Sequence, residues 1–304
     1  MKRLTSLSVA LFAIVSTGCS NHEHTYELVV HEKDTWHTFL EGEDFKTDGI
    51  EVCLKCKHCD KEKEVEYTLE NNENLTIGQK SVTFKYEDYT YEYPIQVKNK
   101  YKIACVGDSL TAGHYWADKS YPSYLSKIVS DKYEVGNFGV NGISITGYGG
   151  SFSSTAPNQR YIKQDVYKNC VDFDPDIFAI MLGTNDATEW DKAEPTFLSE
   201  YRVLLDSFKE QFPFAHIIMM VSPPVVSPNQ FSIPNDKIRD YVNPIQRQLA
   251  DEYILKLIDL RNDFEDTPNF ETEFLRPNDN VHFTENGAEF VANKVWNIAK
   301  DLRP

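Results

Sequence analysis

The segment Tyr101–Leu110 reads Tyr-Lys-Ile-Ala-Cys-Val-Gly-Asp-Ser-Leu, an apolar run that ends in a glycine, an aspartate and a serine. A short continuous apolar run before the small-residue turn Thr111-Ala112-Gly113 is typical of a buried strand. Open α/β sheets bind their ligands at the carboxyl ends of the strands. The pattern therefore predicts that Ser109 lies at the ligand-binding edge of such a sheet.

After Tyr101 the chain alternates apolar runs with amphipathic stretches. Strands are predicted at 102–106, 133–137, 177–182, 217–221 and 255–259, and helices at 121–130, 161–170, 195–211, 235–252 and 285–302. The last helix has clear start chemistry, because Thr284 can cap it and Glu285 complements the dipole of its first turn. This alternation predicts a mostly parallel sheet covered by helices on both faces.

Three further short segments accompany Gly107-Asp108-Ser109-Leu110. They are Asn137–Gly142 (NFGVNG), Gly183–Asp186 (GTND) and Asp279–His282 (DNVH). In this order and at these separations they resemble the four sequence blocks of the SGNH (GDSL) hydrolase family, over roughly 101–304. The resemblance implies a flavodoxin-like three-layer α/β/α fold with a parallel sheet, and a serine esterase that uses neither a cofactor nor a metal.

A serine hydroxyl becomes a good nucleophile only when a neighbouring base removes its proton. Three histidines follow Tyr101, and His282 is the one with an acid close by, since Asp279 stands three residues before it. His216 opens an apolar stretch, and His114 has no acid near it in sequence. We therefore predict Ser109 as nucleophile, His282 as base and Asp279 as the carboxylate that fixes the imidazole tautomer.

Acyl transfer also needs hydrogen-bond donors for the oxyanion that develops on the carbonyl. The resemblance assigns this role to the backbone N–H of Ser109, the backbone N–H of Gly139 and the side chain of Asn185. A glycine lets the backbone approach the substrate closely, and an asparagine amide donates without carrying charge. Asp108 and Asp186 are interpreted as residues that brace their loops.

A second Asp-x-x-His pattern occurs at Asp34-Thr35-Trp36-His37. No serine motif accompanies it, so we interpret it as non-catalytic.

Two irregular polar segments, 143–160 and 222–234, are expected to line the pocket, and neither provides the long apolar lid of a lipase. The candidate wall residues are Tyr148, Phe152, Trp190 and Phe231. The segments VGDSLTAG, IMLGTNDA and NVHFTENGAEFVA are most similar in sequence to those of SGNH carbohydrate esterases that remove acetyl groups from polysaccharides or sialic acids. This similarity implies an acylated carbohydrate as the substrate.

Two other functions stay open. One is a lysophospholipase or thioesterase of the same family, which would prefer long acyl chains. The other is a surface adhesion protein whose hydrolase domain is an inactive scaffold.

The first residues have the features of a secretory signal peptide, with a basic start at Met1-Lys2-Arg3 and an apolar stretch over Leu4–Thr17. The ending Ser16-Thr17-Gly18-Cys19 resembles a bacterial lipobox, in which the cysteine is acylated. We expect 1–18 to be removed and Cys19 to anchor an extracytoplasmic lipoprotein in a membrane surface. Ordinary secretion and an uncleaved anchor are the alternatives.

The chain of 304 residues is acidic, with a formal net charge of −16. Loss of Lys2 and Arg3 with the signal peptide would make it −18. Such a charge argues against nucleic acid and anionic lipid as partners, because both would be repelled. The length beyond the signal peptide favours two domains.

Residues 26–98 show strand-like alternation at 49–52, 64–69, 81–86 and 90–97, with no helical period. The segments Phe45–Ile50 and Gly78–Phe84 resemble parts of a bacterial Ig-like module. The resemblance implies a small all-β sandwich that acts as a spacer or binds cell-wall or surface glycan.

Cys53, Cys56 and Cys59 stand three residues apart, so that two Cys-x-x-Cys pairs share one residue. They could bind zinc if His22, His24 or His58 supplied a further ligand, or they could form one local disulfide with a spare thiol. The spacing favours the disulfide, because it does not fix a fourth metal ligand.

Overall fold

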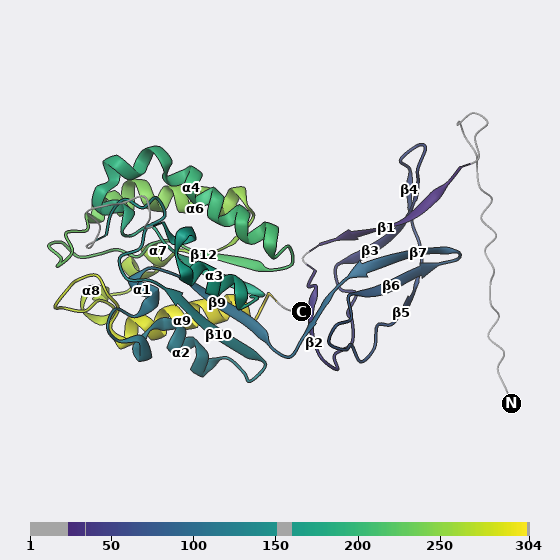
Figure 1. Cartoon of the computed structure of the whole chain (residues 1–304), viewed down its shortest axis with the longest axis horizontal. Helices are drawn as coiled ribbons and strands as arrows, with labels where there is room; N and C mark the ends of the chain where they lie inside the picture. Colours follow the sequence, from purple (N-terminus) through teal and green to yellow (C-terminus); the bar gives the residue numbers. More distant parts are fainter. Residues whose placement is uncertain (1–23, 34, 151–159, 303–304) are drawn as a thin grey trace. The chain divides into compact units, whose positions relative to one another are not determined.

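The computed structural model describes residues 24–33, 35–150 and 160–302 (Figure 1). The expected signal peptide with Cys19, the acid Asp34 and the wall candidate Phe152 lie outside the described residues. No described helix is both long and apolar enough to cross a bilayer. The contacts divide the chain into two compact units, of which the first comprises Met1–Thr35, Lys46–Asn72 and Ser81–Pro94, and the second Trp36–Phe45, Glu73–Lys80 and Ile95–Pro304.

The second unit is built on a parallel five-stranded sheet, in the order β10-β9-β11-β12-β13. Its strands are β9 (Tyr101–Gly107), β10 (Tyr133–Gly139), β11 (Ile177–Met181), β12 (His216–Met220) and β13 (Lys256–Ile258). All five residues of β11 are buried, as expected for a strand covered on both faces. The predicted parallel α/β fold is confirmed, and its strand order is the flavodoxin-like one.

Helices cover both faces of this sheet (Figure 1). One face carries α2 (Tyr121–Ile128) and α9 (Glu285–Ala299), and the other carries α3 (Asp165–Asp172), α4 (Trp190–Gln211) and α6 (Asn243–Glu252). Tyr167 of α3 packs on Phe208 of α4, and Arg202 of α4 pairs with Glu252 of α6. The short elements are α1 (Ser109–Ala112), η1 (Ala117–Lys119), η3 (Tyr161–Lys163), η4 (Asp186–Glu189), α5 (Asn235–Lys237), η5 (Ile238–Val242), α7 (Leu260–Glu265) and α8 (Phe270–Glu273).

Two prolines explain two of the differences between the observed and the predicted helices. Helix α4 begins at Trp190 rather than at residue 195, because Pro195 near its start removes only one N–H from the hydrogen-bond ladder. The predicted helix 235–252 is divided into α5, a π-helical turn (η5) and α6. Pro244 has no N–H to donate, and the preceding Asn243 N–H bonds the Ile238 carbonyl five residues back.

The N-terminal strands form three small sheets. Their orders are β1-β3-β4 and β5-β6-β7, both antiparallel, and a parallel pair β2-β8. The strands are β1 (Tyr26–Glu32), β2 (Thr38–Leu40), β3 (Ile50–Cys56), β4 (Glu62–Glu64), β5 (Thr68–Glu70), β6 (Ser81–Tyr86), β7 (Tyr89–Pro94) and β8 (Gln96–Lys98). The single strand predicted at 64–69 is wrong, because the chain changes sheets there: Glu64 pairs with Cys53 and Thr68 with Lys85.

The expected sandwich over 26–98 is not one compact unit. Strands β2 and β8 and the segment Glu73–Lys80 group with the parallel-sheet unit. Within that unit the Trp36 ring stacks on His216, with ring centroids 5.0 Å apart, and meets Tyr101 edge-on. Strands are present in the N-terminal region as predicted, whereas the resemblance to an Ig-like module stays a prediction.

Candidate active site

Ser109 lies at the carboxyl edge of the sheet, directly after β9. Asp108 caps the short helix α1, and its Oδ1 accepts the Leu110 N–H at 2.9 Å. Ser109 is the first residue of that helix. Strand β9 is flanked by β10 on one side and β11 on the other, so the serine stands where the strand order reverses. Open α/β sheets form their ligand crevice at that point.

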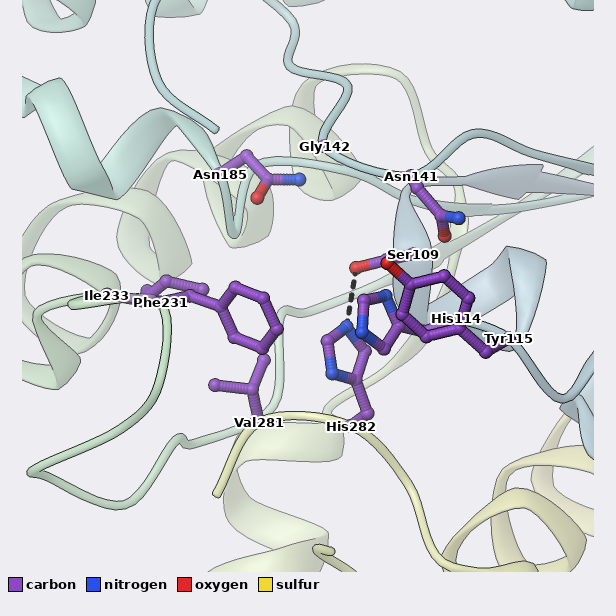
Figure 2. A pocket seen from close by; sticks show the side chains of 10 residues that line it. All are labelled: Ser109, His114, Tyr115, Asn141, Gly142, Asn185, Phe231, Ile233, Val281 and His282. Atoms are coloured by element: carbon purple, nitrogen blue, oxygen red, sulfur yellow. Dashed lines mark hydrogen bonds between the residues drawn. The ribbon is translucent and has the colours of Figure 1, made fainter. Parts of the chain in front are cut away.

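A chain of hydrogen bonds connects Ser109 to an acid through His282, and Figure 2 shows the bond between Ser109 and His282. His282 Nε2 lies 2.8 Å from Ser109 Oγ, and His282 Nδ1 lies 3.0 Å from Asp279 Oδ2. His282 and Asp279 are each only 3% exposed. Because an ionised carboxylate can only accept, it keeps the proton of the neutral imidazole on Nδ1 and leaves Nε2 to accept from the serine hydroxyl.

Asp279 is held in its ionised form by its surroundings. Burial alone would raise its pKa, but hydrogen bonds from the His282 ring and from the backbone N–H groups of His282 and Val281 outweigh burial and lower the pKa. Those two N–H groups reach Oδ1 at 2.8 Å and 2.9 Å. The carboxylate therefore has its own donors and is aimed at the imidazole by the backbone of the same loop.

Arg276 joins the loop of the serine to the loop of the histidine, a role that sequence reasoning missed. Its guanidinium donates to the carbonyls of Phe283 (2.9 Å), His114 (3.0 Å) and Gly113 (3.0 Å). It also lies 4.0 Å from the centroid of the Trp116 ring. Its position three residues before Asp279 was the available clue, but only the fold shows what it binds.

The ring of His114 stacks face to face on that of His282. Their centroids are 3.8 Å apart and the planes differ by 1°. Burial, the neighbouring His282 and the Arg276 charge lower the pKa of His114 to about 4, against an opposing effect of Asp279. His114 is therefore a neutral ring at neutral pH, and it covers one face of His282.

Asn185 and Gly142 border the same pocket as Ser109 and His282 (Figure 2). Asn185 Nδ2 donates one of its two protons to the Ile143 carbonyl at 2.8 Å, which fixes the amide beside the pocket.

Gly139, the predicted glycine donor, lies elsewhere. Its N–H bonds Asn137 Oδ1 at 3.0 Å, and its Cα packs against the backbone of Ala112. The pocket is lined by Gly142, three residues later, with a φ of 73°. The assignment of Gly139 to the pocket is therefore corrected to Gly142.

The two other acids brace their loops, in agreement with the sequence interpretation. Asp186 accepts the backbone N–H groups of Ile145 and Thr146, both at 3.0 Å, and the Thr146 hydroxyl at 2.7 Å. Burial raises the pKa of Asp186 to about 6 and that of Asp108 to about 7. Asp186 thereby shapes the loop that carries Gly142.

The pocket is small and of mixed character. Its volume is about 370 Å³, including space open to solvent. Of the predicted wall residues that the structure describes, Phe231 lines it and meets the His282 ring edge-on at 5.0 Å, whereas Trp190 is buried against Phe197. Tyr148 packs against the core. The remaining lining residues are Ser109, His114, Tyr115, Asn141, Gly142, Asn185, Ile233, Val281 and His282.

The histidine of the second Asp-x-x-His pattern, His37, does not line this pocket. His37 stacks on Phe214, with centroids 4.4 Å apart. Phe214 precedes β12, so His37 lies at the amino edge of the sheet, opposite the edge that carries Ser109.

Comparison with known proteins agrees with this geometry. The sequence model of the GDSL-like Lipase/Acylhydrolase family matches residues 105–290, and the chain belongs to that family. It is similar to an acetylxylan esterase of Xylanibacter ruminicola, 26% identical over 207 residues, which are 58% of this chain and 41% of the relative. The chain thus spans less than half the length of this curated relative.

Solved structures show the same fold. The lipase/acylhydrolase from Enterococcus faecalis superposes with a TM-score of 0.52 at 20% identity, covering 66% of this chain and 96% of that one. The aryl esterase of M. smegmatis superposes with a TM-score of 0.53 at 18% identity, covering 66% and 99%.

The close packing around Gly139 predicts that a side chain at this position destabilises the fold. A Cβ on Gly139 would lie 2.2 Å from the Ala112 nitrogen, so Gly139→Ala must displace α1 or the end of β10. We expect Gly139→Ala to lower the free energy of unfolding by roughly 1–3 kcal/mol, the usual cost of overpacking. Urea denaturation measures it. An unchanged midpoint would show that β10 and α1 do not approach as described.

His114 gives a pH prediction. Its pKa of about 4 lies below the value of about 6.5 expected in the unfolded chain. The folded state therefore binds fewer protons between these values, so the His114 contribution to stability falls as the pH drops from about 6.5 to about 4. NMR titration of the His114 ring, assigned with His114→Phe, should give a midpoint near 4. A midpoint at or above 6.5 would contradict the buried stack.

Proposed function

We propose that this chain is a serine esterase that hydrolyses short acyl esters, most specifically O-acetyl groups on carbohydrate. The observation that carries the proposal is the hydrogen-bonded series Ser109–His282–Asp279 at the edge of a pocket. In this geometry a nucleophile and a base lie within hydrogen-bonding distance, and the acid fixes the tautomer of the base, as acyl transfer requires.

In the proposed acylation step, Ser109 Oγ attacks the ester carbonyl while His282 Nε2 takes the hydroxyl proton. The tetrahedral intermediate collapses when the carbon–oxygen bond to the alcohol breaks and His282 returns the proton to that alcohol. Water then attacks the acyl-enzyme and gives a proton to His282. His282 returns this proton to Ser109 Oγ as the acyl carbon–oxygen bond breaks and the carboxylic acid leaves. Asp279 stays ionised throughout and stabilises the imidazolium.

We assign the oxyanion to three donors: the backbone N–H of Ser109, the backbone N–H of Gly142 and the Asn185 amide. Gly142 replaces Gly139 because it lines the pocket, whereas the Gly139 N–H already bonds Asn137. Asn185 Nδ2 has a second proton beyond the one given to Ile143. Preorganised donors of this kind contribute much of the rate enhancement in acyl transfer.

The acyl group is proposed to be short, and the alcohol that carries it is proposed to be a sugar. A pocket of about 370 Å³ that includes open space leaves little room for a long chain. Its lining mixes the amides of Asn141 and Asn185 with the rings of Tyr115 and Phe231, which suits a polar alcohol such as a sugar better than lipid. The similarity to an acetylxylan esterase favours an acetylated polysaccharide as the substrate class.

The place of action is proposed from the sequence. The basic, apolar and small-residue start of the chain, followed by Cys19, favours an exported lipoprotein that would meet polysaccharide outside the cytoplasm.

Removing the nucleophile tests the mechanism. Ser109→Ala should abolish hydrolysis of p-nitrophenyl acetate, and Asn185→Ala should lower kcat by roughly 10²–10³-fold, the usual loss for one oxyanion donor. Steady-state kinetics measures both, and His37→Ala is the matched control that should keep full turnover. Normal turnover by Ser109→Ala would refute the proposed function.

The preferred acyl length distinguishes the proposed short-chain esterase from a lysophospholipase or thioesterase of the same family. Along a series of p-nitrophenyl esters, kcat/KM should be highest for acetate or butyrate and fall for longer chains, because the pocket cannot enclose them. Acetyl release from acetylated xylan should accompany it. A kcat/KM that rises steadily toward palmitate would instead indicate a lysophospholipase or thioesterase.

A further inference from the structure

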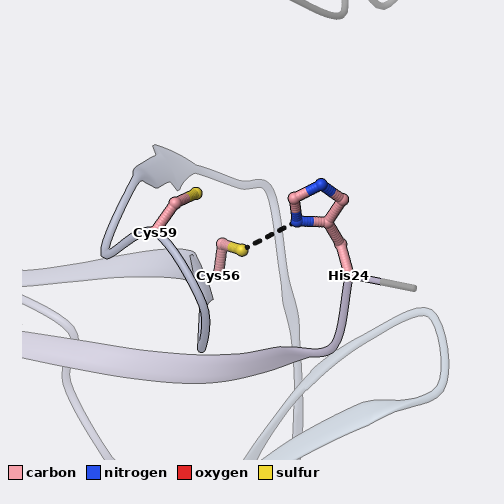
Figure 3. A group of neighbouring side chains, drawn as sticks. All are labelled: His24, Cys56 and Cys59. Atoms are coloured by element: carbon pink, nitrogen blue, oxygen red, sulfur yellow. Dashed lines mark hydrogen bonds between the residues drawn. The ribbon is translucent and has the colours of Figure 1, made fainter. Parts of the chain in front are cut away.

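The first unit contains a cluster of soft metal-binding side chains, His24, Cys56 and Cys59 (Figure 3). His24 Nδ1 lies 3.4 Å from Cys56 Sγ, and the ligand atoms of the three residues all lie within 4.8 Å of one another. Cys56 is buried and His24 is exposed. The cluster is therefore open to solvent on one side.

The fold of the β3–β4 hairpin brings the two thiols together. Cys56 is the last residue of β3, and its N–H bonds the Lys61 carbonyl while its carbonyl accepts the Asp60 N–H. Asp60 has a φ of 51°, the left-handed conformation that lets the chain reverse tightly. This turn returns Cys59 to the side of Cys56.

Strand pairing brings the histidine to the same place. Tyr26, the first residue of β1, is paired with Cys56 across the antiparallel sheet. His24 precedes Tyr26 by two residues, so its side chain reaches the end of the hairpin. Three ligands from two distant parts of the sequence thus meet through hydrogen-bonded backbone.

No disulfide joins Cys53, Cys56 and Cys59 in the structure, so the local disulfide that the spacing favoured is not formed. Two neighbouring groups are less suited to a soft metal. His58 Nδ1 lies 3.5 Å from the Thr25 hydroxyl, and the group His31, Cys53 and Glu62 combines a raised thiol pKa with a short His31–Glu62 hydrogen bond of 2.6 Å. A third group, His114, Asp279 and His282, belongs to the proposed esterase site, where the ring nitrogens of His282 already contact Ser109 and Asp279.

We propose that His24, Cys56 and Cys59 bind one Zn²⁺ ion, with its fourth position open to water. Two thiolates and an imidazole are ligands that zinc prefers, and their charges balance the ion. The bound ion connects the start of β1 to the β3–β4 turn. It therefore acts as a cross-link in the first unit, independent of the esterase site.

Metal content tests the site directly. The full chain is reduced, loaded with zinc, freed of excess metal and assayed by mass spectrometry for zinc per chain. The wild type should retain one ion, and Cys56→Ser, Cys59→Ser and His24→Ala should retain none. Substitution with Co²⁺ should give a thiolate-to-cobalt charge-transfer band and the visible spectrum of a tetrahedral site in the wild type alone.

Two controls match the ligands in residue type and location. Cys53→Ser and His58→Ala should each keep the ion, and far-ultraviolet circular dichroism identifies any variant that fails to fold. Because Cys59 is less buried than Cys56, Cys59→Ser decides the matter if Cys56→Ser unfolds. A reduced wild type that holds no zinc, or a control that loses zinc as completely as Cys59→Ser, would overturn the site. Activity toward p-nitrophenyl acetate should be unchanged in all five variants.

Discussion

The hydrogen bond between Ser109 and His282 joins residues that are 173 positions apart, and the arrangement of the second unit makes it possible. The serine follows strand β9, which lies between β10 and β11, and the histidine stands just before the last helix, α9. A parallel sheet brings the ends of its strands to one edge, and α9 packs beside α2 on one face. The distance of 2.8 Å therefore depends on the whole topology.

Local contacts hold in place the two loops that the topology brings together. Arg276 connects the histidine loop to the carbonyls of Gly113 and His114, so separating the two loops would leave N–H groups of this buried guanidinium unpaired. The neutral ring of His114 and the edge of Phe231 enclose the imidazole. A base held in this way loses little freedom when it accepts a proton, which is the advantage of a preorganised site.

Much of this could be predicted from sequence, because the signals are local. The alternation of apolar strand candidates with amphipathic stretches identified the five strands of the parallel sheet, and the short separation of Asp279 from His282 placed both in one loop. The glycine of the pocket could not be chosen in this way, since Gly139 and Gly142 stand three residues apart in the same segment. What distinguishes them is the packing of Gly139 on Ala112 and the hold of Asp186 on the following loop.

Other features were hidden because they depend on distant partners. Nothing near His114 in sequence indicates that it stacks on His282, and nothing near His24 indicates that a β1–β3 pairing brings it to Cys56. The sequence likewise placed Trp36–Phe45 with the rest of 26–98, whereas the contacts group this segment with the parallel-sheet unit. Hydrophobic periodicity indicates which face of a helix or strand is buried, but it does not indicate which other element that face packs against.

Ser109 is proposed to be the activated serine among the residues that the structure describes. A fluorophosphonate reacts covalently with such a serine, and peptide mapping by mass spectrometry locates the adduct. We expect a single adduct on Ser109 that is lost in His282→Ala, because without the base the hydroxyl keeps its proton. An adduct on another serine, or unchanged labelling of Ser109 without His282, would contradict it.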